Sequence, residues 1–162
     1  STKDNNFSTG GNGAKDYLLG KDYADGIPSR DKAILLQGDP DAVTELINSL
    51  EFSKIYTSGC LAFDGIESQK ITESDKLKLM NEFEQCLFNG LDHNQYAGYW
   101  VEHGDKIDPV TNTPRLELNF VFANVELTTG KSLSVYYDKV DQNRVNLWKD
   151  ISMGNRRNIQ HG

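Results

Sequence analysis

The chain has 162 residues, of which 37% are hydrophobic and 25% charged, a length and composition that suit one globular domain and argue against disorder. Its 17 basic and 24 acidic residues give a formal net charge of −7, which taken alone argues against a nucleic-acid-binding protein. The acidity is uneven, because residues 39–100 hold 4 basic and 11 acidic side chains, whereas residues 131–162 hold 6 basic and 3 acidic ones.

Neither a membrane span nor a secretion signal is visible in the sequence. No apolar run approaches the roughly 18 residues of a transmembrane helix, and residues 1–13 are polar and rich in Gly and Asn. The two cysteines, Cys60 and Cys86, are too few for a disulfide framework, and we expect them to be buried free thiols in a reducing compartment. These features predict a cytoplasmic protein.

The first predicted elements are a short strand and a helix. A Gly-rich run at residues 10–13 predicts a flexible beginning of the chain, and residues 33–37 predict a buried strand. Asp39 and Pro40 are typical of a helix start, with Asp as the N-cap and Pro at the first helical position. The helix that follows has one apolar face, formed by Val43, Leu46, Ile47 and Leu50.

A second strand and a second helix are predicted next. Residues 54–63 are rich in residues that favour β-structure and predict a strand. Thr72 and Asp75 resemble a capping box, and Asn89-Gly90 ends the helix that it begins. The expected core-facing stripe of this helix is Leu77, Met80, Phe83 and Leu87, widened by Leu79 and Cys86.

The remaining sequence predicts three strands and a last helix. The strands are expected over residues 96–103, 116–127 and 133–137, with turn residues at 104–114 and 129–131. Asp141 is a candidate cap for a helix whose core contacts would be Val145, Trp148 and Ile151. This order favours an α+β fold, a central antiparallel sheet with helices packed on one face. We expect one domain over residues 1–162, with residues 1–13 flexible and residues 153–162 as a tail.

Two of the predicted strands carry polar residues that suit a metal ion. Glu117 and Asn119 share one face of their strand, opposite Leu116 and the other apolar residues, because side chains alternate along a strand. If the strands pair as a hairpin, His103 lies across from them, and a set of N and O ligands suits Mn²⁺ or Mg²⁺. Periodicity alone favours a solvent-facing pair, a surface histidine and, at Tyr17, an ordinary half-buried aromatic residue.

Several segments in order resemble the mobilisation relaxases of small plasmids, in particular those of the colicin-plasmid type. The similar segments are residues 16–22 (DYLLGKD), 56–59 (YTSG), 100–103 (WVEH), 115–121 (RLELNFV), 124–131 (NVELTTGK) and 136–138 (YYD), with Trp148. Such enzymes are single-stranded DNA endonucleases of the HUH superfamily with a palm-like sheet, and in this branch a His-Glu-Asn set replaces the usual histidine cluster. The resemblance covers about residues 14–151.

The resemblance implies a role for each matching residue. Tyr17 corresponds to the nucleophile, and His103, Glu117 and Asn119 correspond to the metal set, which would hold Mn²⁺ or Mg²⁺. The implied activity nicks one strand at a plasmid origin of transfer and leaves a 5′-phosphotyrosyl intermediate, which initiates mobilisation. The implied partners are single-stranded DNA and accessory relaxosome proteins, with no membrane.

Other residues are candidates for supporting roles in such a reaction. Asp16 and Asp22 lie near Tyr17 in sequence, and either is a possible proton acceptor or only a surface charge. Candidates for DNA binding are Lys131, Tyr136, Arg144, Arg156 and Arg157. We expect the two acidic helices within residues 39–100 to lie on the back of the sheet, away from Tyr17 and His103.

Three features depart from the family pattern. An apolar first strand is not evident in residues 1–9, which leaves that edge of the sheet in doubt. Eight residues separate Lys106 from Arg115, where the family has about one, and we interpret them as a longer hairpin tip that preserves the strand register. The family continues well beyond the position of Trp148, so we expect an isolated catalytic domain.

Alternative functions remain open on the sequence alone. A related HUH replication initiator would use the same chemistry at a replication origin. A catalytically silent single-stranded DNA-binding module would bind oligonucleotides without metal or covalent product. A generic α+β domain would not bind single strands at all.

Overall fold

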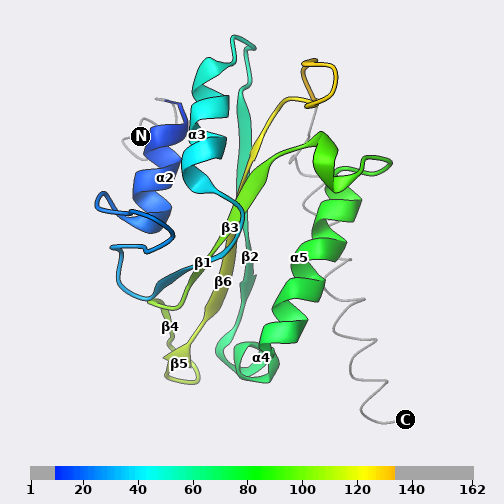
Figure 1. Cartoon of the computed structure of the whole chain (residues 1–162). Coiled ribbons are helices and arrows are strands. Elements are labelled where there is room, and N and C mark those ends of the chain that lie inside the picture. The colour runs from blue at the N-terminus through cyan, green and yellow to red at the C-terminus, as the bar shows by residue number, and fades with distance from the viewer. Residues whose placement is uncertain (1–9, 134–162) are drawn as a thin grey trace. The chain divides into compact units, whose positions relative to one another are not determined.

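A computed structural model describes residues 10–133 of the chain (Figure 1). These residues divide into two compact units, one formed by residues 10–70 and 92–133 and the other by residues 71–91. The predicted last helix, the predicted tail and all but the first residue of the strand predicted over 133–137 lie outside the described residues. All four residues of the predicted catalytic and metal set lie in the first unit.

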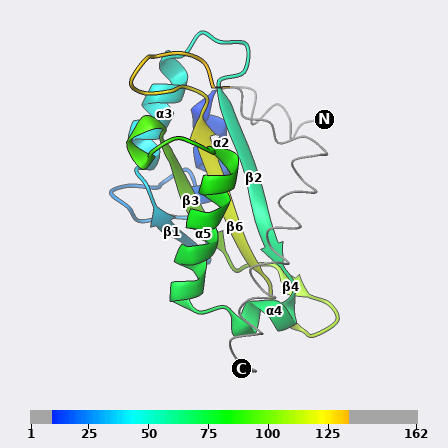
Figure 2. The ribbon, with the colours of Figure 1, turned by 90° about the vertical axis from the view of Figure 1, so that its right-hand side faces the viewer.

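A four-stranded antiparallel sheet runs through the first unit in the order β1-β3-β6-β2 (Figure 1, Figure 2). Its strands are β1 (Ala33–Gln37), β2 (Tyr56–Phe63), β3 (Gly98–His103) and β6 (Leu116–Ala123). β6 lies between β3 and β2, and every one of its residues is buried. The predicted α+β class is confirmed, although β3 and β6 are shorter than the sequence indicates.

Two helices cover one face of this sheet. α2 (Gly11–Leu19) contacts α3 (Pro40–Ser49), and α3 also contacts β3 and β6. The Asp39 carboxylate accepts hydrogen bonds from the backbone N–H groups of Asp41 and Ala42, and a proline occupies the first turn. The predicted start of α3 is therefore confirmed, because the cap satisfies N–H groups that have no partner within the helix.

The Gly-rich run near the beginning of the chain is helical where the sequence predicts flexibility. Residues 11–13 form the first turn of α2. Gly11 is buried against α3, where an added Cβ atom would lie 3.2 Å from the Cα of Thr44 and 3.4 Å from the Cβ of Ile47. The missing side chain thus permits a close approach of the two helices, which offsets the poor helix propensity of glycine.

The apolar core on the helix-covered face fixes which strand positions point toward α2 and α3. Its buried members include Ala14, Leu18, Leu19, Val43, Ile47, Tyr99, Val101, Val121 and Ala123. Because side chains alternate along a strand, the odd-numbered positions of β3 and β6 face the helices. His103, Glu117 and Asn119 therefore lie on the helix-covered face.

The first acidic helix does not lie where the charge distribution predicts. α3 packs beside α2, the helix that carries Tyr17, and the Nζ of Lys15 on α2 lies 3.0 Å from the Oδ1 of Asp41. The prediction of a position on the back of the sheet is therefore wrong for α3. The apolar stripe of α3 is buried in the same core as that of α2, and the free energy gained by this burial decides the position of α3 rather than the charges on its surface.

The eight-residue insertion forms a small hairpin of its own. β4 (Ile107–Asp108) pairs with β5 (Thr113–Pro114), and β3 and β6 keep a continuous register with His103 opposite Glu117. The hairpin packs on α4 (Gly65–Lys70), beside which it lies in Figure 2. The predicted preservation of register is confirmed.

A tight turn follows β6 and contacts the short 3₁₀ helix η1 (His93–Gln95). The carboxylate of Glu126 accepts hydrogen bonds from the hydroxyls of Thr128 and Thr129 at 2.7 Å and from Gln95 Nε2 at 3.2 Å. These hydrogen bonds stabilise the charged carboxylate and lower the pKa of Glu126 to about 2.

The second unit contains α5 (Glu73–Leu87). Thr72 and Asp75 form the predicted capping box. The buried face of α5 includes Leu79, Met80 and Phe83, but Leu77 is exposed. The predicted stripe is therefore only partly right, because the buried face is rotated toward Leu79.

Both cysteines are more accessible to solvent than the sequence predicts. Cys60 and Cys86 are free, but Cys60 is half-buried and Cys86 exposed, so the prediction of buried thiols is wrong. Burial, reinforced by the charge of Glu117, raises the pKa of Cys60 to about 12, which makes it a poor nucleophile. Within residues 10–133, no helix combines the length and apolar character that crossing a membrane requires.

Candidate active site

The antiparallel pairing of β3 with β6 brings the predicted metal residues together. His103 is the cross-strand partner of Glu117, and Val101 is the partner of Asn119. The exposed fractions of the three residues are 2% for His103, 7% for Glu117 and 9% for Asn119. The alternative of a solvent-facing polar pair is therefore wrong, and the strand buries its polar face as well as its apolar face.

His103 is oriented by the end of α2. Its Nε2 donates a hydrogen bond to the backbone carbonyl oxygen of Leu18 at 2.7 Å, since a carbonyl can only accept. This bond places the proton of a neutral imidazole on Nε2 and leaves Nδ1 as the ring's lone-pair donor. Burial lowers the pKa of His103, which favours the neutral form that binds metal ions.

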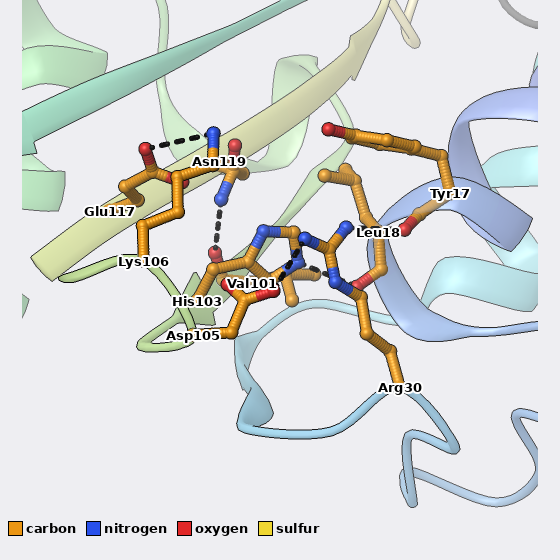
Figure 3. A network of polar contacts seen from close by, with 9 residues as sticks. All are labelled: Tyr17, Leu18, Arg30, Val101, His103, Asp105, Lys106, Glu117 and Asn119. Carbon is orange, nitrogen blue, oxygen red and sulfur yellow. Dashed lines mark hydrogen bonds and ion pairs between the residues drawn. The ribbon is translucent and has the colours of Figure 1, made fainter. Parts of the chain in front are cut away.

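Asn119 and Glu117 are also held by named partners. Asn119 Nδ2 donates to the carbonyl oxygen of Val101 at 3.3 Å, an arrangement that orients the amide and keeps Oδ1 as an acceptor. The Oε2 of Glu117 lies 3.3 Å from the Nζ of Lys106, which follows β3 (Figure 3). The ammonium group of Lys106 is therefore paired with the carboxylate that would bind the metal ion.

The donor chemistry of this face fits a divalent cation. One imidazole nitrogen, one carboxylate and one amide oxygen are a suitable ligand set for Mn²⁺ or Mg²⁺. The hydrogen bond from His103 to Leu18 is the kind of outer contact that orients metal-bound histidines. Among residues 10–133, no three His, Cys, Asp or Glu side chains gather as a metal site, and the proposed set has two of these types plus Asn119.

Tyr17 is near the C-terminal end of α2 and contacts the metal-set histidine. Its side chain is 47% exposed, and its ring meets the His103 ring edge-on, with 6.5 Å between centroids. In Figure 3 the phenol extends from α2 toward the strand that carries Asn119. The structure therefore unites all four residues of the predicted catalytic and metal set, although they are spread over a hundred positions of sequence.

Three residues at this site have no role in the sequence-based predictions. Arg30 lies in the loop before β1, and Asp105 and Lys106 follow β3 at the base of the inserted hairpin. The guanidinium of Arg30 lies 4.9 Å from the Tyr17 ring centroid and 3.1 Å from the Oδ2 of Asp105. No local sequence pattern distinguishes Arg30 or Asp105, because the contact between them joins loops that are 75 positions apart.

Charges at the site cancel. Arg30 and Lys106 balance Asp105 and Glu117, so the four side chains sum to zero. A bound dication would make this cluster positive by two units. The negative net charge of the whole chain therefore does not describe the local surroundings of Tyr17.

Of the remaining predicted residues, the structure describes Asp16, Asp22 and Lys131, and these three do not gather at Tyr17. Asp16 is adjacent to Tyr17 on α2, where neighbouring side chains do not face each other, and its charge acts instead on Tyr99 under the helix. Asp22 is exposed in the following loop. Lys131 lies beyond the far end of β6, and that end of the strand is about 20 Å from Glu117 at roughly 3.3 Å per residue. The other DNA-binding candidates, Tyr136, Arg144, Arg156 and Arg157, lie outside the described residues.

Comparisons with known proteins find two relatives. Over 153 residues the chain is 46% identical to cryptic plasmid protein C of Neisseria gonorrhoeae, a match that covers 94% of this chain and 65% of that protein. Over 142 residues it is 44% identical to DNA relaxase MbeA of Escherichia coli, which covers 88% of this chain and 25% of that protein. No protein-family model and no solved structure matches.

The chain thus spans less than two thirds of the length of each curated relative that it matches. One of these relatives is named for a plasmid and the other for a DNA relaxase activity. The chain is thus similar to part of a plasmid protein and to part of a protein named as a DNA relaxase.

Proposed function

We propose that this chain carries the strand-nicking site of a plasmid mobilisation relaxase. The observation that carries the proposal is the contact of the half-exposed Tyr17 ring with His103, whose strand neighbour is Glu117. The similarity to DNA relaxase MbeA supports the same function. The substrate would be single-stranded DNA at an origin of transfer, with accessory relaxosome proteins as partners in the cytoplasm.

The reaction we propose is a transesterification. The Tyr17 hydroxyl oxygen attacks the scissile phosphorus, the bond from phosphorus to the 3′ oxygen breaks, and a 5′-phosphotyrosyl ester forms. The phenolic proton passes to water, and the departing 3′ oxygen takes up a proton from water to become a free hydroxyl. One phosphodiester replaces another, so the strand can later be resealed without a nucleotide cofactor.

His103, Glu117 and Asn119 would hold Mn²⁺ or Mg²⁺. When bound, such an ion stabilises negative charge on the scissile phosphate oxygens. The bond from His103 to Leu18 serves two purposes, because it orients the imidazole and attaches the end of α2 to the strand. Since Tyr17 directly precedes Leu18, this one hydrogen bond fixes the position of the nucleophile relative to the proposed metal ligand His103. With only one carboxylate in the set, most of the positive charge of a dication remains available to the phosphate.

The test is formation of a covalent protein–DNA adduct. The protein is incubated with an oligonucleotide carrying the origin of transfer of its plasmid and Mn²⁺, and the adduct is detected by its slower migration in a denaturing gel. We expect an adduct from the wild-type protein, none after chelation of the metal, and none from Tyr17→Phe. Tyr23→Phe is the matched control, since this nearby tyrosine is outside the site and should leave the adduct unchanged.

An adduct formed by Tyr17→Phe would contradict the assignment of the nucleophile. An adduct formed with a replication origin but not with an origin of transfer would indicate a replication initiator. Binding of the oligonucleotide without any adduct, with or without metal, would indicate a silent binding module and refute the proposed reaction.

A further inference from the structure

Arg30 is the residue that joins the nucleophile to the strand of the metal site. Its Nη1 donates to the backbone carbonyl oxygen of Tyr17 at 2.8 Å, and its Nη2 donates to the Oδ2 of Asp105 at 3.1 Å. Its guanidinium also lies 4.9 Å from the centroid of the Tyr17 ring. One side chain therefore contacts the backbone and the ring of Tyr17 and an acidic residue two positions after His103 (Figure 3).

The backbone of Arg30 is itself fixed to α2. The N–H groups of Ser29 and Arg30 donate to the carbonyl oxygen of Leu19 at 2.8 and 3.0 Å. The guanidinium therefore lies at the C-terminal end of the helix, where carbonyl groups lack helical partners and positive charge is favoured. These bonds hold Arg30 in place before any substrate is present.

Asp105 completes the arrangement from the sheet side. Its Oδ2 accepts the hydrogen bond from Arg30 Nη2, and the two opposite charges pair at 3.1 Å. The side chains of the ion pair are partly exposed, 20% for Arg30 and 33% for Asp105. Two N–H groups of one planar fork serve two different acceptors here, which a lysine ammonium cannot reproduce while also stacking on a ring.

A tyrosine that is half-exposed at a helix end needs an external contact to keep one rotamer. His103 limits the ring on one side, and Arg30 lies over it on another. In-line attack on phosphorus requires a defined position of the phenol oxygen, and a displacement of about 1 Å can cost roughly 100-fold in rate.

We propose that Arg30 and Asp105 form a clamp that positions Tyr17 for attack. The clamp is a positioning device that acts through the ring and backbone of Tyr17, and it rests on the proposed function. The inserted hairpin contributes to it, because Asp105 lies at the hairpin base. The sequence-based predictions assign no role to either residue.

The first test separates positioning from DNA binding. We compare Arg30→Gln, Arg30→Lys and Asp105→Asn with the control Lys21→Gln, which removes a positive charge from the same loop at an exposed position. With saturating oligonucleotide, we expect the single-turnover rate of adduct formation to fall roughly 10- to 100-fold in the three clamp variants. The oligonucleotide dissociation constant should change no more than it does in Lys21→Gln. The double variant Arg30→Gln/Asp105→Asn should be no slower than Arg30→Gln alone, because both changes break one unit.

The second test needs neither DNA nor metal. The protein is labelled with 3-fluorotyrosine, and the fluorine resonance of residue 17 is assigned as the one absent from Tyr17→Phe. We expect this resonance to shift in Arg30→Gln and Asp105→Asn and to stay in place in Lys21→Gln, with circular dichroism confirming that each variant is folded.

Each outcome bears on the clamp. An unmoved fluorine resonance in both clamp variants, or a wild-type adduct rate in Arg30→Lys, overturns it. A shifted resonance in a protein that forms no adduct even as wild type supports the contact and refutes the proposed function instead. A loss of oligonucleotide affinity without a change in rate at saturation overturns positioning in favour of a phosphate contact.

Discussion

Two buried threonines in the first unit should respond in opposite directions to the same substitution. Thr44 on α3 and Thr57 on β2 are each 4% exposed. The hydroxyl of Thr44 has no hydrogen-bond partner within residues 10–133, whereas the hydroxyl of Thr57 donates to Asn124 Oδ1 at 2.8 Å. Replacement by valine removes a hydroxyl and adds a methyl group at both positions, so only the hydrogen-bonding context differs.

The expected magnitudes follow from that context. A buried polar group without a partner costs about 1–3 kcal/mol, so Thr44→Val should raise the free energy of unfolding by about 1 kcal/mol. Thr57→Val leaves Asn124 Oδ1 without its donor, and the Asn124 amide cannot turn without breaking its bond from Nδ2 to the Lys54 carbonyl oxygen. We expect a loss of about 1–2 kcal/mol there, which separates the two variants by about 2–3 kcal/mol.

Urea unfolding at 25 °C, followed by circular dichroism, measures both changes. Comparable m-values in the three proteins would show that the surface exposed on unfolding is the same, so that midpoints report stability. The measurement also tests the packing of α2, because the Cγ2 of Thr44 lies against Gly11 and is retained in valine. If both variants moved the midpoint in the same direction, the assignment of one satisfied and one unsatisfied hydroxyl would be wrong.

Three further predictions concern the turn after β6, the sheet and the metal residues. The pKa of Glu126 is lowered from 4.5 to about 2, so the carboxylate contributes to the free energy of unfolding above pH 4.5, and this contribution is lost as the pH falls toward 2. The stability difference between wild type and Glu126→Gln, measured by urea midpoints, should therefore shrink over that range. Gly98→Ala should lower the free energy of unfolding by about 1–3 kcal/mol or more, because the new Cβ would overlap the Phe122 ring and lie 2.6 Å from a backbone oxygen. An unchanged melting temperature would contradict this packing. Lys106→Met should tighten Mn²⁺ binding roughly 2- to 5-fold in calorimetry without DNA, since an ion pair whose lysine is half-exposed contributes about 1 kcal/mol or less. Weaker binding would show that Lys106 does not compete with the ion for Glu117.

Local patterns predict several elements of this protein well. The Asp-Pro start of α3, the capping box of α5 and the position of the strand at 33–37 are confirmed because each depends on hydrogen bonds or periodicity within a few residues. The predicted burial of that strand is wrong, since none of its residues is buried and β1 is an edge strand of the sheet. The shared face of Glu117 and Asn119 follows in the same way from the alternation of a strand. Motif resemblance adds Tyr17 and His103, which no local pattern distinguishes from ordinary aromatic and surface residues.

Predictions that depended on distant partners were less successful. The charge of α3 suggested a solvated position behind the sheet, but its apolar stripe packs with α2 on the face that carries the site. The glycines of residues 11–13 suggested flexibility, yet Gly11 serves a helix contact that only the partner helix reveals. In both cases the deciding energy comes from burial against another element.

The sequence by itself determined the alternation of polar and apolar residues in β6, the positions at which two helices of the chain begin and the identity of the residues that resemble a relaxase site. Only the tertiary structure decided that the polar face of β6 is buried, because alternation shows which residues share a face but not what covers it. Only the fold likewise brings Arg30 to Asp105 across 75 positions of sequence. Such a contact leaves no periodic signal, since its two residues lie in loops whose separation is set by the strands between them.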